Sequence, residues 1–505
     1  MSDSDSNSSQ ELQYNELFDF CSSESLSEEG LLEIIERHKS LEAKKDDINE
    51  DEKKSILLAY GNENVTEGIA RLLLTHFPDS ARAADSMGHT PLHIACNNIN
   101  ITPSTVQLLI DVAPDTVRRL DDNGHLPLHL ICITITTIEE QTRIAILQLL
   151  LEEYPESARV VCANGNDSIL PIHVASMERS YEFCRLLIDA YPGSERISNG
   201  GGFLPLHIAC MNEEGNALPT IKYLYELYPD AINQKDDNDL LYPTQFAIFK
   251  KQNLTGAADI VKFLYGCDPN VKLQKCRGGI SNLLLACCRE YDDSNIEDGI
   301  EIIGIIYDAY PEALDVDIFT ELFQLPNTHE QVQTFINREL VYARQARLLS
   351  AIPTERAQIS VHMAVRNNVR LGSIKLLVQV NLSALHNPNF GGVRPIHLAC
   401  EHHNSTDVVE YLLDFDATTS QLEDQSGDVA LHYACRGAKY NNIALLLEKC
   451  DVASVSKRNA NGKLPLDLLF ESNDIIDRES IEYTDCIYRL LRSHPEMEEY
   501  RCEAS

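Results

Sequence analysis

Short apolar boxes recur along the chain at a nearly constant interval and predict a series of short helices. In most copies a Pro is followed by an apolar residue, a His, a second apolar residue and a small residue, and a Cys often closes the box. The copies stand at Thr90–Cys96, Leu126–Cys132, Leu170–His173, Leu204–Cys210, Arg394–Cys400 and Leu431–Cys435. Self-similarity at such a period is the sequence signature of a repeat array.

The His of each box marks the phase of the repeat. Adjacent intact boxes place this residue 34 to 44 positions apart. Degenerate copies continue the phase at Leu57, Gln245, Leu284, His362 and Asp467, and we expect one blurred copy near Phe323. The count gives roughly a dozen units.

A second apolar helix is expected after each box. Leu and Ile recur there at three- and four-residue steps, which places them on one face of a helix. Such segments lie at Thr66–Phe77, Ser104–Ala113, Ile144–Tyr154, Tyr181–Tyr191 and Thr220–Tyr228. Several end in an aromatic residue followed by Pro. Because Pro disfavours helical geometry in the residue before it, this pair predicts the end of the second helix.

The links between units carry a turn signal. Gly stands five positions before the marker, as at Gly88 and Gly124, and an Asp or Asn often stands three positions earlier, as at Asp85 and Asp121. An Asx residue followed by Gly suits a tight turn with a left-handed backbone angle. The Pro of the box then fits the first turn of a helix, where a missing N–H is tolerated.

The pattern Asp-x-x-Gly-x-Thr-Pro-Leu-His-x-Ala-Cys at Asp85–Cys96 resembles the ankyrin repeat, and the resemblance covers about residues 50 to 495. It implies an all-α repeat, an ankyrin-type solenoid of stacked helix pairs with short β-hairpin or loop fingers. In that family the box opens the inner helix of each pair. The fingers and inner helices form a concave surface that binds proteins, and catalytic activity is unusual.

Two departures from the family pattern stand out. Leu replaces the usual Thr at Leu126, Leu170, Leu204 and Leu464, so the usual Thr–His contact is unavailable in those units. An aromatic-Pro-x-Ser/Ala segment follows the second helix, as at Phe77–Ala81, where the family has Gly-Ala. This variant resembles ankyrin families expanded in diatoms and related algae.

The repeat predicts a division of the chain into several segments. We expect a disordered acidic N-terminus at 1–12, a degenerate helical cap at 13–50, a first array at 51–311, a second array with its C-terminal cap at 355–496, and a tail at 497–505. The segment 312–354 has lost the box. It is either a bent or widened unit that interrupts the stack or a decayed ordinary repeat, and Phe335–Leu349 favours one long helix there. The extra residues between His129 and His173 should extend the inner helix or its loop.

Composition narrows the choice of partner and compartment. The net charge of −36 argues against direct binding to nucleic acid, which demands a basic surface. No apolar run is long enough to span a membrane. The polar, acidic N-terminus suggests no secretory signal, and 15 Cys in its absence favour reduced thiols. We therefore expect a monomeric intracellular protein, in the cytoplasm or else in the nucleus, that binds a protein partner and inserts in no membrane.

The His-x-x-Cys spacing within the boxes suggests either a zinc half-site or a structural pair. Recurrence in register favours the structural interpretation, because an active site is needed only once and free Cys packs as a small apolar residue. We expect each imidazole to bond backbone, and no cofactor, metal or catalytic residue. The structural box residues are Pro91, His93, Pro127, His129, Pro171, His173, Pro205, His207, His362, Pro395, His397, His432 and Pro465.

Fingertips and inner-helix ends are the positions free to carry a binding surface. The candidate partner-binding residues are Met87, His89, Asn97, Asp122, His125, Phe203, Met211, Phe390, His402, Arg436 and Lys463. Met87, Phe203 and Phe390 are candidate anchors, or else they pack on the next finger.

We therefore expect a non-enzymatic scaffold or adaptor that binds partner proteins through the concave finger and inner-helix surface. Two alternatives stay open. One is an enzyme or enzyme-regulatory subunit with its chemistry in the atypical region 315–354. The other is a thiol or metal sensor that uses the repeat Cys and His.

Overall fold

The computed structural model describes residues 16–39, 50–133, 138–162, 168–213, 217–250, 254–314, 329–349, 361–403, 405–450, 452–472 and 480–493. The expectations for 1–12, for the blurred copy near Phe323 and for the tail 497–505 lie outside this part. The chain divides into two compact units, Met1–Leu285 and Ala286–Ser505, which we call unit 1 and unit 2. Each is described by itself.

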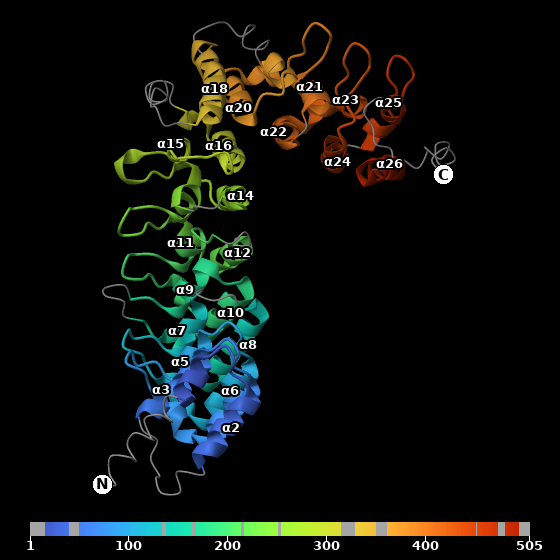
Figure 1. Ribbon diagram of the computed structural model, residues 1–505. Helices are drawn as coiled ribbons and strands as arrows, with labels where there is room; N and C mark the ends of the chain where they lie inside the picture. Colours follow the sequence, from blue (N-terminus) through green and yellow to red (C-terminus); the bar gives the residue numbers. More distant parts are fainter. Residues whose placement is uncertain are drawn as a thin grey trace, which may run out of the picture. The chain divides into compact units, whose positions relative to one another are not determined.

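Unit 1 is a stack of antiparallel helix pairs, coloured blue to green in Figure 1. A short helix over 16–22 and α3 (Glu50–Gly61) begin the row of inner helices. The row continues with α5 (Pro91–Cys96), α7 (Pro127–Cys132), α9 (Pro171–Glu178), α11 (Pro205–Ala209), α13 (Pro243–Gln245) and α15 (Asn282–Cys287), which carries the chain into unit 2. The outer helices are α2 (Glu28–Lys39), α4 (Glu67–His76), α6 (Pro103–Val112), α8 (Glu140–Glu153), α10 (Tyr181–Ala190), α12 (Leu218–Leu227) and α14 (Ala257–Cys267).

Unit 2 repeats the arrangement after α16 (Ile296–Ala309). Its inner helices are a short helix over 361–366, α21 (Pro395–His402), α23 (Ala430–Arg436) and α25 (Pro465–Glu471). Its outer helices are α20 (Leu371–Val380), α22 (Asp407–Asp416), α24 (Tyr440–Lys449) and α26 (Ile481–Ser493). Both units are all-α repeats of the expected class. The inner helices α3, α5, α7, α9, α11 and α13 pack on one another in succession, as do α21, α23 and α25, and most of them also pack on their own outer helix.

The ends of the helices follow the sequence signals. Five inner helices of unit 1, α5, α7, α9, α11 and α13, start with Pro at the first helical position. The aromatic residue before Pro ends α4, α8, α10 and α12 in a non-helical conformation, and a 3-10 turn follows, as at Pro78–Arg82 after Phe77. The exception is the turn after Tyr191, which starts later, at Ser194.

The atypical region contains one long helix, α18 (Glu330–Leu349), which begins five residues before the helix expected at Phe335–Leu349. Its Glu339 is fully buried, and one of its carboxylate oxygens accepts a hydrogen bond from the Ser373 hydroxyl at 2.5 Å. The Ser373 oxygen also lies 2.9 Å from the hydroxyl of Tyr307 on α16. These bonds join α16, α18 and α20 in one packed group. Residues 315–328 and 350–360 lie outside the described part.

The extra residues between His129 and His173 were expected in the inner helix or its loop. The helix is not extended, and residues 134–137 of the loop lie outside the described part. The inner helix α7 has 6 residues, the same length as α5. The outer helix α8 has 14 residues, whereas α6 has 10, and the segment between α8 and α9 is also longer than its neighbour.

The fingers are hydrogen-bonded loops, and no named strand occurs among the residues that the structure describes. In the first finger the Asp85 Oδ1 accepts the amides of Met87 at 2.8 Å and His89 at 2.9 Å. Gly88 has a φ of +79°, which an L-residue adopts only with strain. The Asx-Gly pattern of the sequence therefore encodes the turn, as expected.

Adjacent fingers are joined by single backbone bonds. The Asp122 amide donates to the Met87 carbonyl at 2.9 Å, and the Asp237 amide donates to Gly201 at 3.0 Å. In unit 2 the Gln425 amide donates to Gly391 at 3.0 Å, and the Ala460 amide donates to Ser426 at 2.8 Å. These bonds hold the fingertips of successive units in register.

Candidate functional site

The box His joins its own unit to the next one. The Nδ1 of His129 accepts the backbone amide of Leu126 at 3.0 Å, and its Nε2 lies 3.0 Å from the carbonyl of Val160 in the following unit. The equivalent pairs of bonds occur at His93, His173, His207, His397 and His432. Leu126 therefore loses the Thr hydroxyl contact found at Thr90, but the backbone bond to the imidazole remains.

These bonds fix the protonation state of the imidazole. An Nδ1 that accepts an amide must be unprotonated, so the proton resides on Nε2 and is donated to the carbonyl. Burial lowers the pKa of His129 from 6.5 to about 4, and it lowers the pKa of His93, His173, His207 and His397 to about 4 in the same way. At neutral pH these five imidazoles are thus uncharged structural groups.

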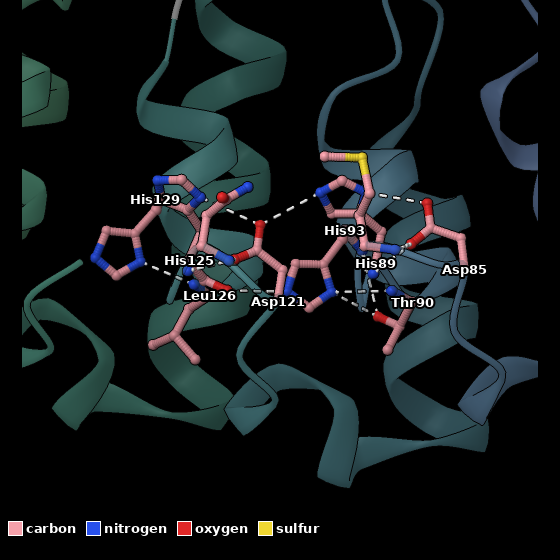
Figure 2. Close-up of polar contacts among 10 residues, drawn as sticks. Asp85, His89, Thr90, His93, Asp121, His125, Leu126 and His129 are labelled. Carbon is pink, nitrogen blue, oxygen red and sulfur yellow. Dashed lines mark hydrogen bonds and ion pairs between the residues drawn. The ribbon is translucent and has the colours of Figure 1, made fainter. Parts of the chain in front are cut away.

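A line of alternating carboxylates and imidazoles runs across the first two fingers (Figure 2). His89 Nδ1 lies 3.1 Å from Asp85 Oδ2, and His89 Nε2 lies 3.3 Å from Asp121 Oδ2. The same Asp121 oxygen lies 3.2 Å from Nδ1 of His125. Both nitrogens of His89 thus face carboxylate oxygens, one from each of the two fingers.

The two carboxylates in this line are held ionised. Partial burial acts to raise the pKa of Asp85, but hydrogen bonds from the amides of His89 and Met87 outweigh it and lower the pKa. At Asp121 burial is likewise outweighed by bonds from the amide and side chain of His125, which lower its pKa. The line therefore ties two fingers together by charge as well as by backbone bonds.

Apolar side chains are exposed on the finger and inner-helix surface of unit 1. Leu58 follows the marker position of α3 by one residue and is 38 % exposed. Met177 and Phe249 follow their markers by four residues and are 43 % and 40 % exposed. Half-buried apolar residues occupy the same two phases in other units: Ile94, Leu130, Ile133, Val174 and Met211. Large exposed apolar side chains that share a face indicate a binding surface.

In unit 1 the predicted site residues fall into two groups. Met87, Asn97 and Asp122 are exposed, whereas His89 and His125 are partly buried in the line of charges. Phe203 packs against His207 and Phe246, with ring centroids 6.3 and 5.5 Å apart. Met211 is half-buried at the end of its inner helix.

In unit 2 the predicted site residues differ in exposure and pairing. Phe390 is fully exposed at a fingertip. Arg436 is ion-paired with Asp428 and lies 4.9 Å over the ring of Tyr433. Lys463 contacts Glu471 at 2.6 Å, and His402 lies 3.7 Å from Glu401. Three of these residues in unit 2 therefore lie beside a carboxylate.

The candidate residues predicted from the sequence do not include Leu58, Met177 and Phe249. The signal was present in the phase of the repeat, because all three stand one or four residues after a marker position. One helical turn separates these two phases, so they share a face of the inner helix.

The box cysteines are packing groups. Cys96 is fully buried, and burial raises its pKa to about 12; burial also raises the pKa of Cys132, Cys400 and Cys435. Within the described ranges, no group of three or more His, Cys, Asp or Glu side chains is arranged to hold a metal ion. Among the helices of those ranges, none has both the length and the apolar character required to cross a membrane.

Comparison with protein-family models identifies three copies of the ankyrin repeat at residues 361–466, within unit 2. A search of curated proteins finds no match. The matched segment contains the boxes at His397 and His432, and the bonds of these imidazoles recur at the boxes of unit 1. Residues 361–466 of the chain are therefore ankyrin repeats.

Proposed function

We propose that this chain is a non-enzymatic scaffold or adaptor that binds partner proteins through its finger and inner-helix surface. Ankyrin repeats generally mediate protein–protein interaction. The observation that carries the proposal is the exposure of Leu58, Met87, Met177 and Phe249 on unit 1. Partly exposed apolar side chains on a rigid helical frame offer binding energy at a low cost in ordering, because the fingers are already fixed by hydrogen bonds.

The surface is suited to a protein rather than to a nucleic acid. The chain has a net charge of −36, and phosphate backbones bind basic surfaces. The exposed Asp122 at a fingertip adds negative charge to the apolar surface of unit 1. We accordingly expect partners with apolar and basic side chains.

Affinity capture from extracts of the source cells tests the proposal with two triple variants. The surface variant carries Met87→Arg, Asn97→Arg and Asp122→Arg, all at exposed positions. The control variant carries Thr75→Arg, Asp111→Arg and Gln141→Arg, at exposed positions of the outer helices. Both sets change the net charge by the same amount, so a nonspecific effect of charge acts on both.

We expect the wild-type chain and the control variant to retain the same proteins, and the surface variant to lose them by about tenfold or more, the loss typical of removed interface anchors. Equal capture by all three chains would place the binding surface elsewhere. Capture of no protein by the wild-type chain would contradict the binding function itself.

A further inference from the structure

A hollow of about 500 Å³ opens at the N-terminal end of the finger and inner-helix surface of unit 1. Its walls come from the helix over 16–22, from α3, from α5 and from the first finger. The apolar lining consists of Phe18, Leu57, Leu58 and Ile94, and Phe18 is 43 % exposed to solvent. A hollow of this size is typical of sites that bind a small molecule or an anchoring side chain.

The hollow exists because one side chain is absent. Gly61 stands four residues after the marker position of α3, the phase that carries Asn97 and Met177 in later units. A Cβ built at Gly61 would meet Ile94 Cγ2 at 3.4 Å, so a larger side chain would enter the space over Ile94. The fourth residue after the marker therefore has no side chain in the repeat of α3, whereas it is Asn97 in the repeat of α5 and Met177 in that of α9.

The walls of the hollow are held in place. The side-chain amide of Asn62 donates to the carbonyls of Cys21 and Ser23 at 3.0 and 2.8 Å, which fixes the helix over 16–22 against the end of α3. The side-chain amide of Asn98 joins α5 to α3 in the same way, with bonds of 2.8 Å to the carbonyls of Tyr60 and Asn62. A preformed site loses little free energy in ordering when a ligand binds.

The charge around the hollow is negative. Asp85 is the ionisable residue of the lining, and its carboxylate is held ionised by the hydrogen bonds of the first finger. Asp122 is exposed on the next fingertip, with its carboxylate against Gly88. A ligand that combines an apolar group with nearby positive charge is therefore the complementary one.

We propose that this hollow binds a bulky apolar side chain, such as Phe, Leu, Ile or Met, from a segment of a partner protein in which Lys or Arg flanks that residue. The apolar side chain enters between Phe18, Leu58 and Ile94, and the basic residues face Asp85 and Asp122. This proposal rests on the proposed function and adds the position and the chemistry of the anchor.

Two glycine variants of the full chain provide the test. Gly61→Leu fills the hollow, and it replaces a helical Gly that has no left-handed backbone angle. Gly266→Leu is the matched control, because Gly266 also lies near the C-terminal end of a helix, α14, and a Cβ there meets nothing within 4 Å. Neither substitution should destabilise the fold, since Gly is itself a poor helix former.

A random dodecapeptide library displayed on phage is selected on the wild-type chain and on both variants. Selected peptides are then synthesised with a fluorescent label, and their binding is measured by anisotropy. We expect peptides with one bulky apolar residue flanked by Lys or Arg. Their dissociation constants for Gly61→Leu should be about tenfold or more higher than for the wild-type chain, the effect of a lost hot spot. Gly266→Leu should bind them like the wild type.

Four results would overturn the proposal. Selected peptides that bind Gly61→Leu as tightly as the wild type would remove the hollow from the site while leaving the binding function intact. Gly61-sensitive peptides that are acidic or lack a bulky apolar residue would contradict its chemistry. A wild-type chain that dimerises where Gly61→Leu stays monomeric, measured by light scattering, would assign the hollow to a second copy. Selection of no peptide by any chain would count against the proposed function as well.

Discussion

Replacement of the box imidazole by Gln should reduce the acid sensitivity of unit 1. The chain itself supplies the precedent, because Gln245 occupies the same position in a later unit. Its Oε1 accepts the Tyr242 amide at 3.1 Å, and its Nε2 donates to Oδ1 of Asn282 at 2.9 Å. Gln thus supplies an acceptor to its own helix and a donor to the next unit without a titrating group. His129→Gln should keep the fold and lose the pH dependence that His129 causes.

The magnitude follows from the lowered pKa. His129 titrates near 4 in the folded chain and near 6.5 when unfolded, so between these values the unfolded chain binds more protons. Its contribution to stability is fully present above pH 6.5 and is lost as the pH falls toward 4. Linkage gives a loss of about 2 kcal/mol between pH 7 and pH 5 for one such group. Four such imidazoles in unit 1 together give about 8 kcal/mol, comparable with the whole stability of a domain.

Urea unfolding followed by circular dichroism at pH 7 and pH 5 measures the effect. Hydrogen exchange of the amides in α7 and α9 gives a local value, which matters because repeat arrays unfold in parts. We expect His129→Gln to lose about 2 kcal/mol less than the wild type between the two pH values. His402→Gln, at a side chain that is 36 % exposed, is the control and should behave like the wild type. An unchanged pH dependence in His129→Gln would refute the role assigned to the neutral imidazole.

Three further substitutions test contacts between neighbouring repeats or helices, each by urea or thermal unfolding. Gly202→Ala should cost about 3 kcal/mol, because its Cβ would lie 2.5 Å from a backbone nitrogen of the next finger, whereas Gly462→Ala should cost about 1 kcal/mol from its positive φ alone; equal losses would contradict the contact between fingers. Asn98→Ala should cost about 2 kcal/mol through two lost bonds to backbone carbonyls, and the exposed Asn97→Ala should be nearly neutral. Glu339→Ala should destabilise unit 2 by about 3 kcal/mol, because it leaves a cavity and removes the acceptor of a buried hydroxyl; unchanged stability would show that α18 is not held by this group.

Contacts within one unit could be predicted because they join residues a few positions apart. The Asp85–Gly88 turn, the Pro at the start of α5 and the end of α4 at Phe77 all follow from local backbone preferences. The repeat period then predicted the all-α array, since each helix pair buries its apolar face only against the next pair.

The candidate surface was predicted only in part. The exposed Met87 and Phe390 lie at fingertips, but Phe203 packs against Phe246. The phase of the repeat distinguishes these positions: Met87 and Phe390 precede the Gly of the turn, whereas Phe203 follows it, at the position that His89 and His125 occupy in earlier fingers. Phe203 packs because the ring of Phe246 in the next repeat lies 5.5 Å from its own.

The sequence by itself determined the repeat and the turns, because short-range hydrogen bonds depend on residue type and spacing alone. The tertiary structure decided that Asp121 meets both His89 and His125, that extra residues enter α8, and that the missing side chain at Gly61 opens a hollow. The first and the last of these features arise where two neighbouring repeats meet. They depend on how far one unit is displaced from the next, and that displacement results from packing over the whole interface between them.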